Sequence, residues 1–187
     1  MSAQISLVAA GLALAIWIYL IAARGDFWRT WKFDDLAPAP AAANWPSIAV
    51  VVPARDEAAG VAACVTSILS QPYPGRLSMI LVDDQSQDGT SQIASDAATA
   101  IGASDRLTVL QGRPLPSGWT GKLWAVKQGL TMVEGWSAQP DYVLLTDADI
   151  VYSGDLLMRL VARAQRDKLA MTSVMATLRC ESFAEKY

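Results

Sequence analysis

Two aspartates separated by a single alanine form the pattern in this sequence that is best suited to chemistry. Asp147 and Asp149 follow the apolar run YVLLT at residues 142–146. Two carboxylates held this close repel each other unless a positive charge lies between them. Hard divalent cations such as Mg²⁺ bind carboxylate oxygens and phosphate oxygens together. The spacing therefore indicates a cation site that can also hold phosphate.

Two further clusters of charged residues follow apolar runs. ARDE, residues 54–57, comes after the run IAVVVP at 48–53, and DDQSQDGT, residues 83–90, comes after LSMILV at 77–82. If these runs are parallel strands, their carboxyl ends lie at one edge of a sheet, which is where such sheets bind ligands. We therefore expect the three clusters to converge.

A structural role is the alternative for single acids in such loops. Asp often caps the helix that follows a strand, because its carboxylate accepts hydrogen bonds from free backbone N–H groups. Asp56 and Asp88 fit that role as well as they fit a binding site. Capping needs one carboxylate, whereas holding a cation with phosphate suits two, so the paired acids favour a site.

Short apolar runs alternate with segments of helical period from residue 47 onward. This alternation predicts βαβ units and a mostly parallel sheet, hence the α/β class. Strands are expected over residues 48–53, 77–82, 106–110 and 142–146, with a fifth over 169–178. The expected helix faces are Val61, Val65, Ile68 and Leu69; then Ile93, Ala97 and Ile101 after a cap at Thr90; then Leu123, Val126, Leu130 and Val133 before Gly135; then Leu156, Leu157, Leu160, Val161 and Ala164.

The usual glycine-rich phosphate loops are missing from the sequence. There is no GxGxxG, and Gly121 and Lys122 are followed by Leu123 without the upstream glycine of a P-loop. A bound phosphate would therefore depend on a cation at Asp147 and Asp149, with Lys122 and Arg55 as further positive groups.

The N-terminal 23 residues are expected to form a transmembrane helix. Residues 2–23 carry no charged side chain, and about 20 apolar residues in a helix cross the ~30 Å hydrocarbon layer. A cleaved signal peptide is the alternative, but no Lys or Arg precedes the run, which is also long for a signal peptide. Residues 24–46 are then an interfacial segment and Pro/Ala linker, and residues 47–187 the globular domain.

The segment after the apolar run favours a cytoplasmic domain. Arg24, Arg29 and Lys32 lie on this flank only, and positive residues mark the cytoplasmic side. The interleaved aromatics Phe27, Trp28, Trp31 and Phe33 suit the headgroup layer, although they could instead pack on the domain. We expect a single-pass protein of the inner (cytoplasmic) membrane.

Composition excludes several mechanisms. The formal net charge is −3 and there is no histidine, which argues against nucleic-acid binding and excludes an imidazole base or ligand within this chain. Cys64 and Cys180 lie far apart in no metal-type spacing, so we interpret them as free thiols in a reducing compartment.

Four of these segments together resemble the family 2 glycosyltransferases, whose GT-A fold is a nucleotide-binding α/β domain. The matching segments are VVPARDE at 51–57, VDDQSQDGT at 82–90, GKLWAVKQG at 121–129 and TDAD at 146–149, in the family's order. Within the family, PSGWTGKLWAVKQG at 116–129 behind a single N-terminal apolar helix is similar to the hopene-associated glycosyltransferases of bacterial hopanoid synthesis. Carotenoid-type glycosyltransferases carry a similar stretch.

The resemblance implies a set of donor-binding residues. Pro53, Arg55 and Glu57 would border the nucleoside pocket. Asp84 would bond the base, typically uracil, with Asp83 supporting it. Asp147 and Asp149 would be the DxD pair that holds Mn²⁺ or Mg²⁺ on the diphosphate, and Lys122 would lie near the diphosphate or donor sugar. The partners implied are a UDP-sugar and a lipid acceptor such as a hopanoid.

The catalytic base is unknown. In the family it is an Asp or Glu in a later motif, and neither Glu181 nor Glu185 lies in a recognisable one. We therefore expect an N-terminal piece of a longer enzyme or a truncated product, which binds the donor without efficient transfer.

Two other classes stay open. A catalytically silent membrane-anchored scaffold with this fold would show no metal-dependent nucleotide binding. A nucleotidyltransferase usually opens with a Gly-rich loop after its first strand, and ARDEAAG at 54–60 is not one.

Overall fold

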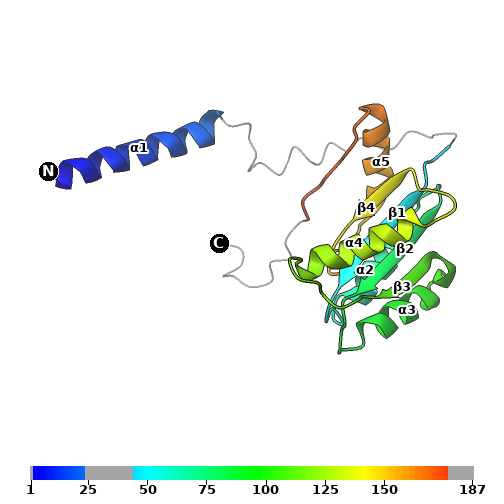
Figure 1. Ribbon diagram of the computed structural model, residues 1–187. Coiled ribbons are helices and arrows are strands. Elements are labelled where there is room, and N and C mark those ends of the chain that lie inside the picture. The colour runs from blue at the N-terminus through cyan, green and yellow to red at the C-terminus, as the bar shows by residue number, and fades with distance from the viewer. Residues whose placement is uncertain (1, 24–43, 177–187) are drawn as a thin grey trace. The chain divides into compact units, whose positions relative to one another are not determined.

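The computed structural model describes residues 2–23 and 44–176. They belong to two units, Met1–Ala37 and Pro38–Tyr187. In the first unit, the uncharged run forms one helix, α1 (Ser2–Ala23; Figure 1). Its stretch Gln4–Ala22 is long and apolar enough to cross a membrane and buries none of its residues in the structure. The aromatic residues between Phe27 and Phe33 lie outside the described residues.

A parallel sheet of four strands organises the second unit, in the order β3-β2-β1-β4. The strands are β1 (Ile48–Ala54), β2 (Leu77–Asp83), β3 (Leu107–Gln111) and β4 (Tyr142–Leu145). β1 and β2 are almost wholly buried, because both of their faces are covered by helices. All four expected strands within residues 48–146 are confirmed, with ends shifted by a residue.

Pro53 in β1 is compatible with this central position. Proline has no N–H to donate to a sheet. The pairing of β1 with β4 stops at Val51 opposite Leu145, so at Pro53 only β2 continues alongside.

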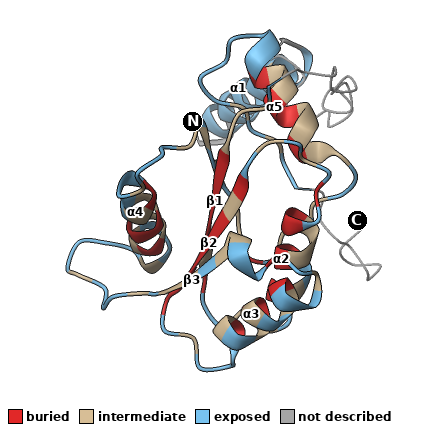
Figure 2. Cartoon of the chain, turned by 90° about the vertical axis from the view of Figure 1, so that its right-hand side faces the viewer, coloured by how far each residue is buried: buried red, intermediate tan, exposed pale blue. Residues whose placement is uncertain are grey.

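Helices cover the two faces of the sheet unequally. α2 (Val61–Leu69) and α3 (Thr90–Ala100) lie on one face, and α4 (Gly121–Glu134) lies on the other (Figure 2). α5 (Leu156–Arg166) adds Leu157 and Val161 to the core on the α2 side. A 3-10 turn, Ser104–Arg106, precedes β3.

The expected face of α4 was partly wrong. Leu123 is 60% exposed, whereas Ala125, Gln128, Gly129 and Val133 are buried. The reason is the close approach of α4 to the sheet: a Cβ on Gly129 would lie 2.4 Å from Cγ1 of Val51. Small residues face the strands, and the large ones turn outward.

The buried face and the N-cap of α3 are each shifted by one residue from those expected from the sequence. Ala94 and Ala98 are buried, while Ile93 and Ala97 pack at the border of the core. Thr90 is the first helical residue and fully buried, and its backbone N–H donates to Oδ1 of Asp88 at 3.1 Å. The expected cap at Thr90 was wrong, because the N-cap residue is Gly89, which has no side chain to accept a hydrogen bond.

The fifth strand expected over residues 169–178 is not formed within 169–176, the part that the structure describes. This segment pairs with none of the four strands, and Met171 and Met175 are 82% and 77% exposed. β-propensity does not make a strand where no strand edge is paired with it.

The expected linker ends earlier than residue 46. Trp45 packs against the core and makes an edge-to-face contact with the ring of Tyr73, and the hydroxyl of Tyr73 donates to the carbonyl of Pro46 at 2.6 Å. Residues 45 and 46 therefore belong to the globular domain, because the apolar ring of Trp45 is partly buried there.

Candidate functional site

The carboxyl ends of β1, β2 and β4 bring the three charged clusters to one edge of the sheet. The strands are parallel and in register from Ile48 opposite Leu77 and Tyr142. The polar residues that follow each strand therefore lie beyond the same edge, as expected from the sequence. Each cluster has its own contacts in the structure.

Asp84 is the buried acid of the β2 cluster. Its side chain is 7% exposed, and its Oδ2 lies 3.3 Å from the Nη1 of Arg55, which follows β1. Gly121, the first residue of α4, is close enough that a Cβ there would lie 3.0 Å from the same Oδ2. Asp84 thus lies where β1, β2 and the start of α4 meet, and it can offer an acceptor to a ligand between them.

Asp83 is occupied by its own loop. Its Oδ1 accepts the backbone N–H of Ser86 at 2.8 Å, and its Oδ2 accepts the hydroxyl of Ser91 on α3. Burial by itself raises the pKa of Asp83, but the bonds from Ser86, Ser91 and Gln111 together lower it below its ordinary value. Asp83 therefore shapes the loop that presents Asp84.

Asp147 already holds a positive group. Its Oδ1 lies 2.7 Å from the Nζ of Lys122 near the start of α4, and both side chains are about half exposed. A metal ion at this oxygen would have to displace or share it with the ammonium of Lys122.

Asp149 and Glu57 add negative charge beside Asp147. The pKa of Glu57 is raised, first by burial and then by the charges of Asp149 and Asp147, while Lys122 opposes the rise. These carboxylates therefore share one electrostatic environment that favours a cation. Glu57 lies close enough to Asp147 and Asp149 for their charges to raise its pKa. Its predicted role beside the nucleoside stays a prediction.

The donor set suits a cation that is shared with a ligand. Within residues 2–23 and 44–176, no group of three or more Cys, Asp and Glu side chains is arranged to hold a metal ion. Two aspartates would leave the remaining coordination positions to phosphate oxygens and water, as Mg²⁺ and similar ions prefer. Asp147 and Asp149 would hold such an ion only together with the phosphate oxygens of a ligand.

Asp56 and Asp88 have structural roles. Asp56 accepts the N–H of Gln87 at 2.9 Å, and Asp88 accepts the N–H of Ala58 at 2.9 Å in addition to that of Thr90. Both join the loop after β1 to the loop after β2. Both acids are therefore bonded within these loops, and neither is the N-cap residue of the helix that follows.

Glycines were the residues that sequence reasoning missed. A Cβ on Gly112 would lie 2.9 Å from the carbonyl of Asp83, and one on Gly60 would lie 3.4 Å from Cα of Asp149. An isolated glycine directly after a strand, as Gly112 is after β3, often marks such a close approach and was the available signal.

Comparison with known proteins identifies the family. A family model described as glycosyl transferase family 2 matches residues 49–186. The chain belongs to glycosyl transferase family 2. The hopanoid branch is a finer assignment that this match does not test.

Curated relatives of this family 2 chain are distant. A beta-monoglucosyldiacylglycerol synthase from Trichormus variabilis is 28% identical over 130 residues, which cover 69% of this chain and 26% of that protein. The glycosyltransferase AglE from Haloferax volcanii is 36% identical over 66 residues, covering 35% of this chain and 21% of that protein. The chain spans about a quarter of the length of these relatives.

A solved structure agrees in fold. The mannosyltransferase PcManGT from Pyrobaculum calidifontis, in complex with GDP-Man and Mn²⁺, superposes with a TM-score of 0.54 at 24% identity, covering 86% of this chain and 42% of that one. The GT-A type of α/β fold expected for family 2 is thereby confirmed. Glu181 and Glu185, considered for the catalytic base, lie outside the described residues.

Proposed function

We propose that this chain carries the donor-binding site of a membrane-anchored glycosyltransferase, which transfers a sugar from a nucleotide diphosphate sugar to the hydroxyl of a lipid. The observation that carries the proposal is the meeting of Asp84 and Arg55 with the Asp147 and Asp149 pair at one sheet edge of a family 2 domain. Asp84 and Arg55 suit the nucleoside, and Asp147 and Asp149 suit the diphosphate. A UDP-sugar is the expected donor, and the transfer is expected to invert the anomeric configuration.

A divalent metal, Mn²⁺ or Mg²⁺, is the proposed cofactor at Asp147 and Asp149. A bound metal stabilises the negative charge that develops on the leaving diphosphate, without a proton donor. The absence of histidine agrees with this chemistry. PcManGT, the solved structure of similar fold, holds Mn²⁺ with GDP-Man. Lys122 would then leave Asp147 to the metal and lie near the diphosphate.

A lipid is the proposed acceptor. The curated relatives named beta-monoglucosyldiacylglycerol synthase make a glucosylated lipid, as their name states, and α1 is long and apolar enough to anchor the domain at a membrane. The motif at 116–129 favours a hopanoid within this class. The base that takes the acceptor proton is unassigned.

Calorimetry tests the donor site. The full chain, solubilised in detergent, is titrated with UDP with and without Mn²⁺, beside Asp149→Ala and a control, Asp96→Ala, from the exposed side of α3. We expect Mn²⁺ to strengthen UDP binding at least tenfold in the wild type and the control, and Asp149→Ala to lose that gain, because one of the two metal ligands is gone.

A folded wild type that binds UDP weakly, or equally with and without metal, would contradict the proposal. That result would favour the silent scaffold.

A further inference from the structure

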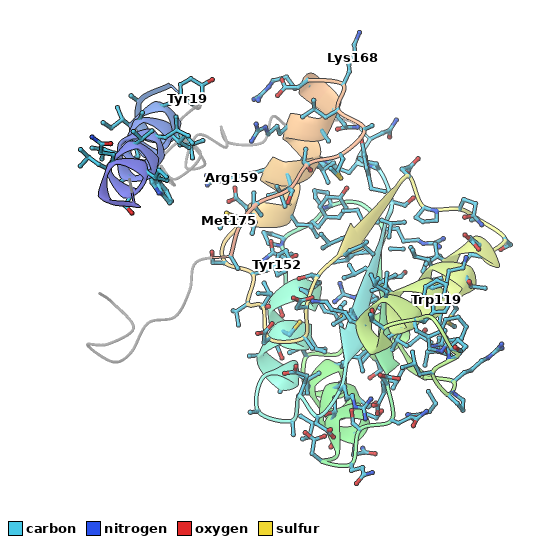
Figure 3. All side chains as sticks on the ribbon, turned by 60° about the vertical axis from the view of Figure 1, so that its left-hand side comes forward. Tyr19, Trp119, Tyr152, Arg159, Lys168 and Met175 are labelled. Carbon is cyan, nitrogen blue, oxygen red and sulfur yellow. The ribbon has the colours of Figure 1, made fainter. Side chains whose placement is uncertain are left out.

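The loop that carries Asp147 and Asp149 is hydrogen-bonded to α2 and to the residues that follow this helix. The hydroxyl of Ser67 accepts the backbone N–H of Tyr152 at 3.0 Å, and the side chain of Gln71 donates to the carbonyl of Tyr152 at 3.5 Å. The same Gln71 accepts the N–H of Leu157, the second residue of α5, at 3.3 Å. Tyr152, labelled in Figure 3, is thus bonded through both of its backbone polar groups.

These two side chains are themselves fixed. The Ser67 hydroxyl donates to the carbonyl of Cys64 at 2.9 Å, and Gln71 donates to the carbonyl of Ser67 at 3.3 Å. Gln71 is only 9% exposed. The bond from Leu157 to Gln71 is buried and the others are part-buried, and breaking such a bond costs free energy because it leaves a shielded polar group unpaired.

The other end of the loop is also in contact with α2. The thiol of Cys64 lies 3.5 Å from the carbonyl of Asp147, and Ala148 is buried at 2% exposure in the core that contains Cys64. At the start of α2, a Cβ on Gly60 would lie 3.4 Å from Cα of Asp149. The helix therefore contacts the loop on both sides of Asp149, at residue 147 and at residue 152.

We propose that Ser67 and Gln71 are positioning residues, which hold the backbone on the far side of Asp149 so that its carboxylate lies where a metal on the diphosphate can bind. Neither residue is aimed at the ligand, and each acts through the loop. The inference rests on the proposed function, in which Asp149 is a metal ligand. Partners of this type, one step removed from the ligands, commonly change metal affinity by 10- to 100-fold when they are removed.

Two readouts on the full chain in detergent test the proposal. Amide hydrogen exchange of residues 146–157 reports whether the loop is held, and Mn²⁺ affinity in the presence of UDP reports whether the metal site depends on it. The variants are Ser67→Ala, Gln71→Met and the conservative Ser67→Thr. The control is Ser95→Ala: the Ser95 hydroxyl donates to the carbonyl of Ser91 at 3.0 Å, so the variant removes a similar helical hydrogen bond in α3, away from the loop.

We expect Ser67→Ala and Gln71→Met to exchange faster over 146–157 and to bind Mn²⁺ about tenfold more weakly. Ser95→Ala should match the wild type in both readouts, and Ser67→Thr should recover most of the affinity. A purely structural role for Ser67 would leave the Mn²⁺ affinity of Ser67→Ala equal to that of Ser95→Ala.

Equal exchange over 146–157 in Ser67→Ala and Ser95→Ala would overturn the proposal, as would faster exchange with unchanged Mn²⁺ affinity. If the wild type itself shows no metal-dependent UDP binding, the proposed function fails separately. The exchange comparison then decides by itself whether Ser67 holds the loop.

Discussion

At the scale of single residues, neighbouring acids of the same type have different roles because their surroundings differ. Asp83 and Asp84 are adjacent in sequence, yet Asp83 is bonded to Ser86 and Ser91 of its own loop, while Asp84 meets Arg55 from another strand. A carboxylate that is bonded by donors of its own loop stabilises the fold, and one whose partner is exposed to solvent can exchange that partner for a ligand. The arginine here is 64% exposed.

The lowered pKa of Asp83 predicts an acid-dependent stability. Burial opposes its ionisation, but the bonds from Ser86 and Ser91 outweigh it, so the folded-state pKa lies below the ordinary value of 3.8. The stabilisation is then complete above the ordinary pKa and is lost as the pH falls through the folded pKa. We expect Asp83→Asn to cost about 1–2 kcal/mol at pH 7, since charge-assisted bonds become neutral ones, and the difference to shrink towards pH 3.

Urea unfolding between pH 3 and pH 7 measures this effect. Ser91→Ala, which removes one donor to Asp83, should move the acid loss of stability to higher pH. The explanation is wrong if wild type and Asp83→Asn lose stability in parallel as the pH falls.

At the scale of elements, α4 is placed by a close approach to β1 and β2. Gly129 has no room for a side chain, because its Cβ would lie 2.4 Å from Cγ1 of Val51 and 3.1 Å from Cγ2 of Val82. The consequence reaches the site, since the N-terminal turn of the same helix carries Gly121 beside Asp84 and Lys122 beside Asp147. A shift of α4 away from the sheet would move both contacts.

Gly129→Ala is therefore expected to destabilise the protein. Helix propensity alone would make alanine better by about 1 kcal/mol, but overpacking of a tight contact costs about 1–3 kcal/mol. We expect a net loss in the free energy of unfolding by urea. Gly135→Ala is the matched control, because its Cβ would meet the nearest atom, the carbonyl of Met132, at 3.4 Å. Equal stability of the two variants would contradict this prediction, because it would show that α4 can move away from the sheet to admit the alanine side chain at little cost.

At the scale of the whole molecule, the apolar surface of the described residues is unevenly covered. Val143 and Leu145 of the edge strand β4 are 43% and 54% exposed, on the face that carries α4, because α4 lies over β1 and β2 instead. The residues of α1 between Gln4 and Ala22 are also unburied. Apolar surfaces of this kind are sites of contact with lipid or with other protein.

Membrane anchorage by α1 is a testable prediction. We expect the full chain to stay with the membrane after alkaline carbonate extraction and a variant lacking residues 2–23 to be released, because burying that uncharged helix in lipid is strongly favourable. In inside-out vesicles, the domain should be open to protease, as the basic flank predicts. A mature chain whose mass shows cleavage near residue 23 would instead establish a signal peptide.

Much of the architecture follows from the sequence by itself. The buried strands at 48–53 and 77–82 are continuous apolar runs, and the polar residues after them necessarily lie at the edge where parallel strands end. The class of fold and the place of the candidate site at this edge could be predicted for that reason, whereas the roles of Asp84, Asp147 and Asp149 in donor binding stay predictions.

Only the tertiary structure decided the partners of those residues and the faces of the helices. Lys122 pairs with Asp147, Arg55 pairs with Asp84, and Ser67 is hydrogen-bonded to Tyr152. The two members of each pair are too far apart in sequence for a helix or strand period to predict their contact. The exposure of Leu123 depends on how near α4 comes to the sheet, and residues 169–176 form no strand because none of the described strands pairs with them. Such outcomes are set by packing distance and by the available hydrogen-bonding edges, which are properties of the assembled chain and not of any one segment.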